Sequence, residues 1–149
     1  MTGKIDIFVR DAKSFRVVDE RHVSNVIVTA QKLNVLRSLC SPSSAPGLLW
    51  TGGVEKMQFG TGSVAESESD EFLSSPITPV KTIESGNISY PSSVTVLFTT
   101  FLLADEANGF PIREAGLLTR DNALAARRTF SVIDKDSDHI VEFAWTITC

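Results

Sequence analysis

The chain has 149 residues, and its 14 lysines and arginines against 18 aspartates and glutamates leave a formal net charge of −4. Hydrophobic residues make up 42% and charged residues 21% of the chain, which argues against disorder, a collagen-like repeat and a disulfide scaffold. Seventeen serines, thirteen threonines and nine phenylalanines favour half-buried pleated surfaces over long helices. We therefore expect one soluble, β-rich domain across residues 1–149.

The charge balance and the apolar runs argue against two classes of partner. A dedicated nucleic-acid binder usually presents a strongly basic face, and this chain is acidic, although four of its arginines fall in one stretch: Arg113, Arg120, Arg127 and Arg128. The longest apolar run, residues 94–103, is too short to cross a bilayer. The N-terminus lacks the basic and apolar segments of a signal peptide. We expect no nucleic-acid partner and no membrane insertion.

The first 47 residues predict a hairpin, a short strand and one helix. Apolar residues alternate along 5–10, and residues 11–14 are expected to turn the chain back into a strand at 15–18. Residues 26–28 predict a further strand. A short α-helix is expected over residues 29–40, with Leu33, Leu36, Leu39 and Cys40 on the apolar face that packs on a sheet. The proline- and serine-rich residues 41–47 should end it.

The rest of the chain predicts strands separated by turns. Strands are expected at residues 57–59, 77–83, 94–103, 112–119, 124–130 and 141–147. In residues 94–103, apolar residues fall on both faces of the expected strand, which predicts burial on both faces. The last strand alternates most clearly, with Val141, Phe143, Trp145 and Ile147 on one face. About eight strands and one helix predict a mainly β fold, an antiparallel β-sandwich.

Candidate ligand sites along the chain each have a structural interpretation that fits better. The acidic run 66–71 lacks the ligand spacing and fixed glycine of a calcium loop, so a solvated face is expected. The Gly60-Thr61-Gly62 turn is not followed by the lysine-serine pair of a phosphate loop. Trp50 and Tyr90 lack the interleaved basic residues of a single-strand binding groove. No cofactor is expected.

Candidate catalytic residues fail in the same way. Asp134, Asp136, Asp138 and His139 cluster near serines, but the chain has no Gly-x-Ser-x-Gly elbow, and aspartates in turns commonly bond their own backbone. Arg127 and Arg128 are adjacent on a strand, so their side chains are expected to point to opposite faces rather than form one patch. We expect no catalytic residue.

Two cysteines, Cys40 and Cys149, are the only thiols, and no metal-ligand spacing surrounds them. They fit either two free thiols in a reducing cytosol or, at the C-terminal Cys149, an intermolecular bridge within an assembly. No metal site is expected.

Four blocks, taken in order, resemble small tail proteins of bacteriophages and the N-terminal module of phage tail-collar and tail-fibre proteins. The first is Asn25-Val26-Ile27-Val28-Thr29 with the leucine helix, and the second is Phe59-Gly60-Thr61-Gly62-Ser63 followed by an acidic stretch and Phe72-Leu73-Ser74-Ser75-Pro76-Ile77. The third is Ile112-Arg113-Glu114-Ala115-Gly116-Leu117-Leu118 with Leu124-Ala125-Ala126-Arg127 and Phe130, and the fourth is the terminal strand 141–147.

The resemblance implies a non-enzymatic structural component of the virion. It implies a tail, baseplate or tail-fibre attachment protein that forms a homo-oligomer, a trimer or hexamer, with other virion proteins. Such a protein is made in the host cytoplasm and ends in the virion tail. Arg113, Glu114, Gly60, Gly62 and Gly116 are then scaffold residues. Two alternatives remain open: a carbohydrate- or receptor-binding module, for which Trp50 is the candidate aromatic platform, and a collar or capsid decoration protein.

Overall fold

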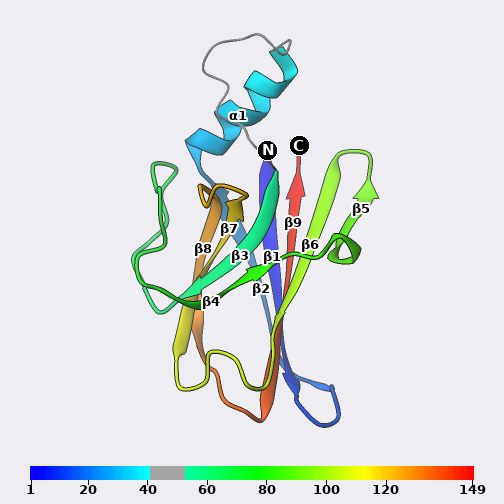
Figure 1. Cartoon of the computed structure of the whole chain (residues 1–149), viewed down its shortest axis with the longest axis vertical. Coiled ribbons are helices and arrows are strands. Elements are labelled where there is room, and N and C mark those ends of the chain that lie inside the picture. Colours follow the sequence, from blue (N-terminus) through cyan, green and yellow to red (C-terminus); the bar gives the residue numbers. More distant parts are fainter. Residues whose placement is uncertain (41–52) are drawn as a thin grey trace.

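In the part of the chain that the structure describes, nine antiparallel strands form one curled sheet with a single α-helix at one end (Figure 1). The computed structural model describes residues 1–40 and 53–149. The strands run in the order β4-β3-β7-β8-β2-β1-β9-β6-β5 across the sheet. This confirms the expected mainly β, antiparallel fold with one short helix, and the described residues form nine strands where about eight were expected.

Most elements lie where the alternation of apolar residues places them. The elements are β1 (Thr2–Asp11), β2 (Val17–Ile27), α1 (Thr29–Cys40), β3 (Val54–Gly60), β4 (Pro76–Thr82), the 3-10 turn η1 (Ser85–Asn87), β5 (Ile88–Ser92), β6 (Thr95–Leu102), β7 (Pro111–Thr119), β8 (Leu124–Asp134) and β9 (His139–Thr148). The turn between β1 and β2, the β7–β8 hairpin and the last strand lie where they were predicted.

The curl brings strands from the two halves of the sheet together around one core. Phe143 on β9 packs against Phe59 on β3, with ring centroids 4.6 Å apart, and against Phe130 on β8 at 6.3 Å. None of these strands is a neighbour of β9 in the sheet, so the contacts are made across the interior. Val141, Phe143 and Trp145 are fully buried, as the alternation in β9 predicts.

Three sequence predictions about strands were wrong. β2 is one strand from Val17 to Ile27, not two short ones, because its charged middle pairs with β1 although it lacks an apolar alternation. β6 is buried on one face only: Phe98 and Leu102 face the core, while Leu103 beyond its end is 46% exposed. β5 was not predicted at all; it is short and pairs with β6 alone.

The helix has the predicted limits but not the predicted contact. Gln31 is buried, whereas Leu33 is 43% exposed, so the expected leucine face does not meet the sheet at that position. The side chains of Leu36, Leu39 and Cys40 lie outside the described residues, and so do the predicted helix stop at 41–47 and Trp50.

Truncating Phe143 tests whether the two halves of the sheet depend on this core. We expect Phe143→Ala to lower the free energy of unfolding by about 3–5 kcal/mol, because it leaves a cavity between β9, β3 and β8. Ala144→Ser, at the next and half-exposed position of β9, should change it by less than about 0.5 kcal/mol. Urea unfolding of both variants gives the comparison, and equal losses would contradict the proposed role of the ring.

Candidate functional site

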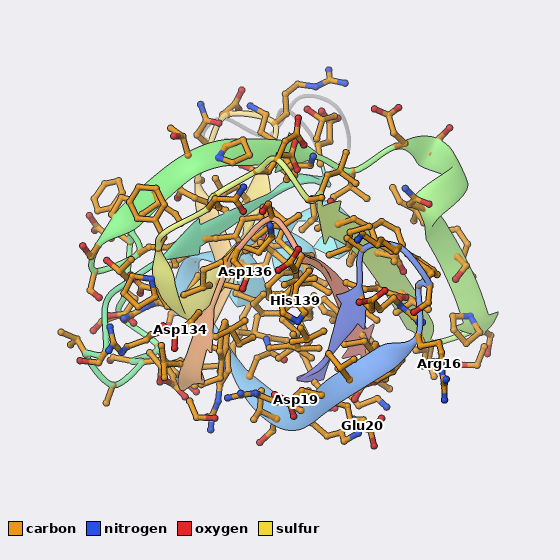
Figure 2. All side chains as sticks on the ribbon, turned by 90° about the horizontal axis from the view of Figure 1, so that it is seen from below. Arg16, Asp19, Glu20, Asp134, Asp136 and His139 are labelled. Atoms are coloured by element: carbon orange, nitrogen blue, oxygen red, sulfur yellow. The ribbon has the colours of Figure 1, made fainter. Side chains whose placement is uncertain are left out.

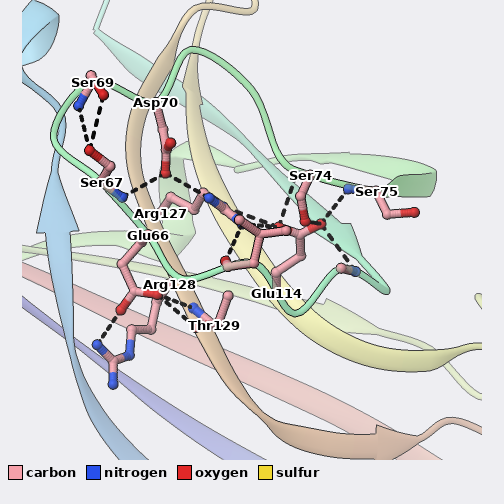
Figure 3. Close-up of polar contacts among 12 residues, drawn as sticks. Glu66, Ser67, Ser69, Asp70, Ser74, Ser75, Glu114, Arg127, Arg128 and Thr129 are labelled. Atoms are coloured by element: carbon pink, nitrogen blue, oxygen red, sulfur yellow. Dashed lines mark hydrogen bonds and ion pairs between the residues drawn. The ribbon is translucent and has the colours of Figure 1, made fainter.

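The segment joining β3 to β4, residues 61–75, crosses the face of β7 and β8 that points away from the main core (Figure 3). We call this segment the strap. Leu73 of the strap is buried with Leu118 of β7 and Leu124 of β8 in a second, smaller apolar cluster. The strap therefore covers the outer side of this half of the sheet, and charged residues hold it there.

Glu114 on β7 is the centre of these contacts and is fully buried. Its carboxylate accepts hydrogen bonds from the N–H groups of Gly62 (3.3 Å), Ser74 (3.1 Å) and Ser75 (2.7 Å), from Ser74 Oγ (3.2 Å), and from Arg127 Nε (3.1 Å) and Nη2 (2.9 Å). A buried carboxylate is tolerated only when it is paired and hydrogen-bonded. Both ends of the strap supply those donors.

Arg127 on β8 is the buried counterion, with a side chain only 2% exposed. Besides Glu114, its guanidinium binds Asp70 Oδ2 at 2.6 Å and the carbonyl oxygen of Val64 at 2.8 Å. Burial alone would lower the pKa of Arg127, but the hydrogen bonds and charges of Asp70 and Glu114 outweigh it and raise that pKa. Arg127 thus remains charged and joins β8 to the middle of the strap.

Arg128 and Thr129, which follow Arg127 on β8, also bind the strap. Glu66 pairs with the guanidinium of Arg128 and accepts hydrogen bonds from Thr129 Oγ1 (2.6 Å) and from the Thr129 N–H (3.3 Å). Adjacent strand residues do point to opposite faces, as expected for Arg127 and Arg128. Both nevertheless reach the same segment, because the strap bends around the edge of β8 (Figure 3).

Three glycines leave the space that this arrangement needs. A Cβ atom on Gly60 would lie 2.5 Å from Glu114 Oε1, and one on Gly62 would lie 2.6 Å from the same oxygen. A Cβ atom on Gly116 would lie 2.9 Å from a methyl group of Leu124. The glycines of the Gly60-Thr61-Gly62 turn therefore leave room for the buried carboxylate of Glu114.

The acidic run 66–71 is solvated only in part: Ser67, Glu68, Ser69 and Glu71 are exposed as expected, whereas Glu66 and Asp70 are half-buried. Glu66 and Asp70 bind arginines, and Glu68 pairs with Lys32 of α1 at 2.6 Å. The carbonyl oxygen of Glu68 also accepts the N–H of Thr29 at 2.8 Å, which connects the strap to the start of the helix. The sequence did not reveal these ion pairs because the partners of the carboxylates are distant in the chain.

Partial burial raises the pKa of Asp70, but the Ser67 N–H and Arg127 lower it by more, so that pKa lies below its ordinary value of 3.8. Burial also raises the pKa of Glu66, and the Thr129 hydroxyl, its own backbone and Arg128 bring it below 4.5. Both carboxylates are ionised at neutral pH and stabilise the attached strap.

The aspartate and histidine cluster near the other end of the molecule forms a turn. Asp136 Oδ1 lies 2.5 Å from His139 Nδ1 and accepts a hydrogen bond from the Asp138 N–H at 3.0 Å. The carboxylate of Asp136 therefore binds other residues of the same turn (Figure 2). Asp134 ends β8. Within residues 1–40 and 53–149, no group of three or more histidines, cysteines, aspartates or glutamates is arranged to hold a metal ion.

The arginine stretch does not form one basic surface. Arg120 pairs with Glu55 at 2.9 Å, and Arg127 and Arg128 pair with the carboxylates described above. Arg113 is half-buried on β7. Among the described residues, no helix is long and apolar enough to cross a membrane.

An apolar hollow of about 300 Å³ lies near the two termini. Val54, Val96 and Phe98 contribute to its lining, and Tyr90, which is 77% exposed, stands beside them. Cys149 is exposed and carries a free thiol.

Comparisons with known proteins add no relative: no family model, curated protein or solved structure matches the chain. The assignment of the site therefore depends on its geometry. Sequence reasoning missed the pairing of Glu114 with Arg127. The signal that could have found it is the position of the two opposite charges on the two strands of the predicted β7–β8 hairpin. Gly116 stands opposite Arg127 and Glu114 opposite Thr129, which puts the two charges on one face as diagonal neighbours.

Neutralising Glu114 should weaken the whole fold. Glu114→Gln leaves Arg127 buried beside an uncharged amide, and we expect it to lower the free energy of unfolding by about 3–5 kcal/mol. Glu71→Gln, at an exposed position of the strap, should cost less than about 0.5 kcal/mol. Denaturant unfolding measures both, and a Glu114→Gln protein as stable as Glu71→Gln would exclude a central role for the pair.

Acid should release the strap. The pKa of Asp70 is lower in the folded than in the unfolded chain, so its stabilising effect is complete above the unfolded pKa and disappears as the pH falls through the folded pKa. Asp70→Asn should therefore cost about 1–3 kcal/mol at pH 7 and progressively less below about pH 4. Thermal unfolding between pH 2 and pH 7 tests this. Val64→Ala, an exposed strap position without a titrating group, should retain the wild-type pH profile.

Proposed function

We propose that this chain is a non-enzymatic structural component of a bacteriophage virion. Its role is that of a tail or baseplate protein, or of a connector that attaches tail fibres, within a symmetric complex. Its partners are other virion proteins and further copies of itself, with neither nucleic acid nor membrane insertion. It is made in the host cytoplasm and incorporated into the tail.

One observation carries this proposal: the second and third of the four sequence blocks that resemble phage tail proteins meet at Glu114. Gly62 comes from the second block, Arg127 and Glu114 come from the third, and Ser74 and Ser75 belong to the segment that completes the second. Through Glu68, the strap also contacts Thr29 at the end of the first block. Residues from three of the four blocks, between Thr29 and Arg127, thus form one scaffold, which supports a shared structural module.

The chemistry of this cluster favours a structural role over catalysis. A general base must come within hydrogen-bond distance of a substrate proton. Glu114 is fully buried, and its oxygens are already occupied by donors from the strap and from Arg127. Asp70 and Glu66 are likewise bound to arginines. These charges are used to attach one part of the chain to another.

The outer face of the β1–β9–β6 part of the sheet supports the proposed assembly. Short hydroxyl side chains stand opposite one another there, with Thr148 between Thr2 and Thr95, and the two hydroxyl oxygens of Thr95 and Thr148 lie 3.2 Å apart. The helix lies beyond one end of the strands rather than across this face (Figure 1). The same face carries Phe8 and Phe101 on either side of Glu142. A face with both kinds of side chain suits an interface made with hydrogen bonds and water as well as apolar contacts.

A carbohydrate- or receptor-binding module is the second candidate. The exposed ring of Tyr90 beside the apolar hollow favours it, since sugars bind to aromatic platforms next to such recesses. A collar or capsid decoration protein would use the same scaffold at another position in the particle.

The decisive experiment locates the protein in purified particles. Mass spectrometry of gradient-purified virions from the phage or prophage that encodes the chain should find it in a fixed ratio to the tail proteins, and labelled antibody should mark the tail in electron micrographs. A replication enzyme of the same phage, absent from the particles, is the matched control.

Two results would contradict the proposal. The first is a chain that stays in the lysate while infectious particles lack it. The second is glycan binding by the purified chain that Tyr90→Ala abolishes while the chain is absent from tails, which would favour the binding module instead.

A further inference from the structure

β2 has one strand edge whose backbone is unpaired over most of its length in the described chain. Along one side it pairs with β1, from Gly3 opposite Asn25 to Arg10 opposite Val17. Along the other side it pairs with β8 only at Val26 and Ile27. Within residues 1–40 and 53–149, no strand pairs with that second side between Val17 and Asn25, where the contact with β8 is made by the Arg21 side chain on the carbonyl oxygen of Ser131. In the view along the strands, β2 forms the border of the molecule at Asp19 and Glu20 (Figure 2).

The other edges of the sheet are protected and this one is not. β4 carries Pro76 and Pro79, and β5 carries Pro91, which cannot donate to a neighbouring strand. The edge of β8 is occupied by the carboxylate of Glu66 on the Thr129 N–H. β2 has no proline between residues 17 and 25, and no described side chain bonds to its backbone there. Such an edge accepts a further strand.

Charge on β2 indicates which strand it accepts. When two copies of one strand pair in antiparallel fashion, a twofold axis passes between the two copies of one residue. The residue before that position then faces the residue after it in the other copy. An axis at Glu20 places Asp19 of each copy opposite Arg21 of the other. An axis at Asp19 or at Arg21 loses this alternation and places two Asp19 or two Arg21 side chains opposite each other, whereas the axis at Glu20 places like charges opposite each other only at Glu20 itself.

The conformations of Asp19 and Arg21 suit this pairing. The two side chains share the face of β2 whose partners on β1, Val9 and Ile7, are buried, and they lie 2.8 Å apart as an ion pair. Arg21 is held at the edge by the carbonyl oxygen of Ser131 at 2.6 Å. A second copy would complete a square of alternating charges. The facing Glu20 side chains lie on the solvent side and are 58% exposed, so water and salt screen their repulsion.

We propose that the β2 edge is a homodimer interface, formed by antiparallel pairing of two copies about a twofold axis at Glu20. The interface joins two nine-stranded sheets into one. Combined with a separate threefold contact it would generate a hexamer. The proposal does not depend on the virion role: a monomeric protein found in tails would overturn the dimer and leave the role intact.

Charge reversal tests the register. The purified full chain should sediment as a dimer at micromolar concentration. D19R and R21D each create a square of like charges and should weaken dimerisation at least tenfold, whereas the double variant D19R/R21D restores alternation and should dimerise again. Circular dichroism confirms that each variant is folded. A wild-type chain that stays monomeric up to 100 µM, or single variants that dimerise like the wild type, would overturn the proposal.

Cysteine cross-linking decides the matter if a charge variant fails to fold. In a background where Cys40 and Cys149 are serine, E20C places two thiols across the axis and should form a disulfide-linked dimer on mild oxidation. H22C, also exposed on the solvent side of β2, is the matched control and should remain monomeric. Cross-linking of H22C in place of E20C would move the axis to His22 and contradict the proposed register, and cross-linking of neither would exclude the interface.

Discussion

The buried ion pair between Glu114 and Arg127 is the constraint on which the rest of this half of the molecule depends. A carboxylate removed from water costs several kcal/mol unless its lone pairs find donors. Here the donors come from the strap, so the strap must lie close against β7, and glycine must stand at Gly60 and Gly62 to let it do so. The same strap then binds the edge of β8 through Glu66 and the start of α1 through Glu68.

The curl of the sheet explains how a nine-stranded sheet can fold without a second layer covering it. Its concave side encloses the apolar core, where Phe59 and Phe143 meet although their strands are far apart in the sheet. Its convex side is free to carry hydroxyl groups on one half and the strap on the other. The curl also separates β2 from β8 beyond their two shared pairs, and this is the physical origin of the open edge of β2.

The alternation of apolar and polar residues predicted the strands that bury every second side chain in the core. β9 and the β7–β8 hairpin could be located from the chain because every second residue contributes to one core. β2 was divided in two because its middle faces a charged boundary of the core, where Asp19 and Arg21 replace apolar residues. The acidic run was interpreted as solvated because the arginines that neutralise Glu66 and Asp70 are about sixty residues away.

By itself, the sequence determined the fold class, the position of the helix, the main hairpins and the four blocks that suggest a tail protein. These properties follow from periodicity and turn residues, which act over a few positions. Only the tertiary structure decided that Glu114 and Arg127 are one buried pair, that the acidic run is an attached strap, and that β2 keeps an open edge. Each of these depends on which distant strands become neighbours, and the curl of the whole sheet sets that.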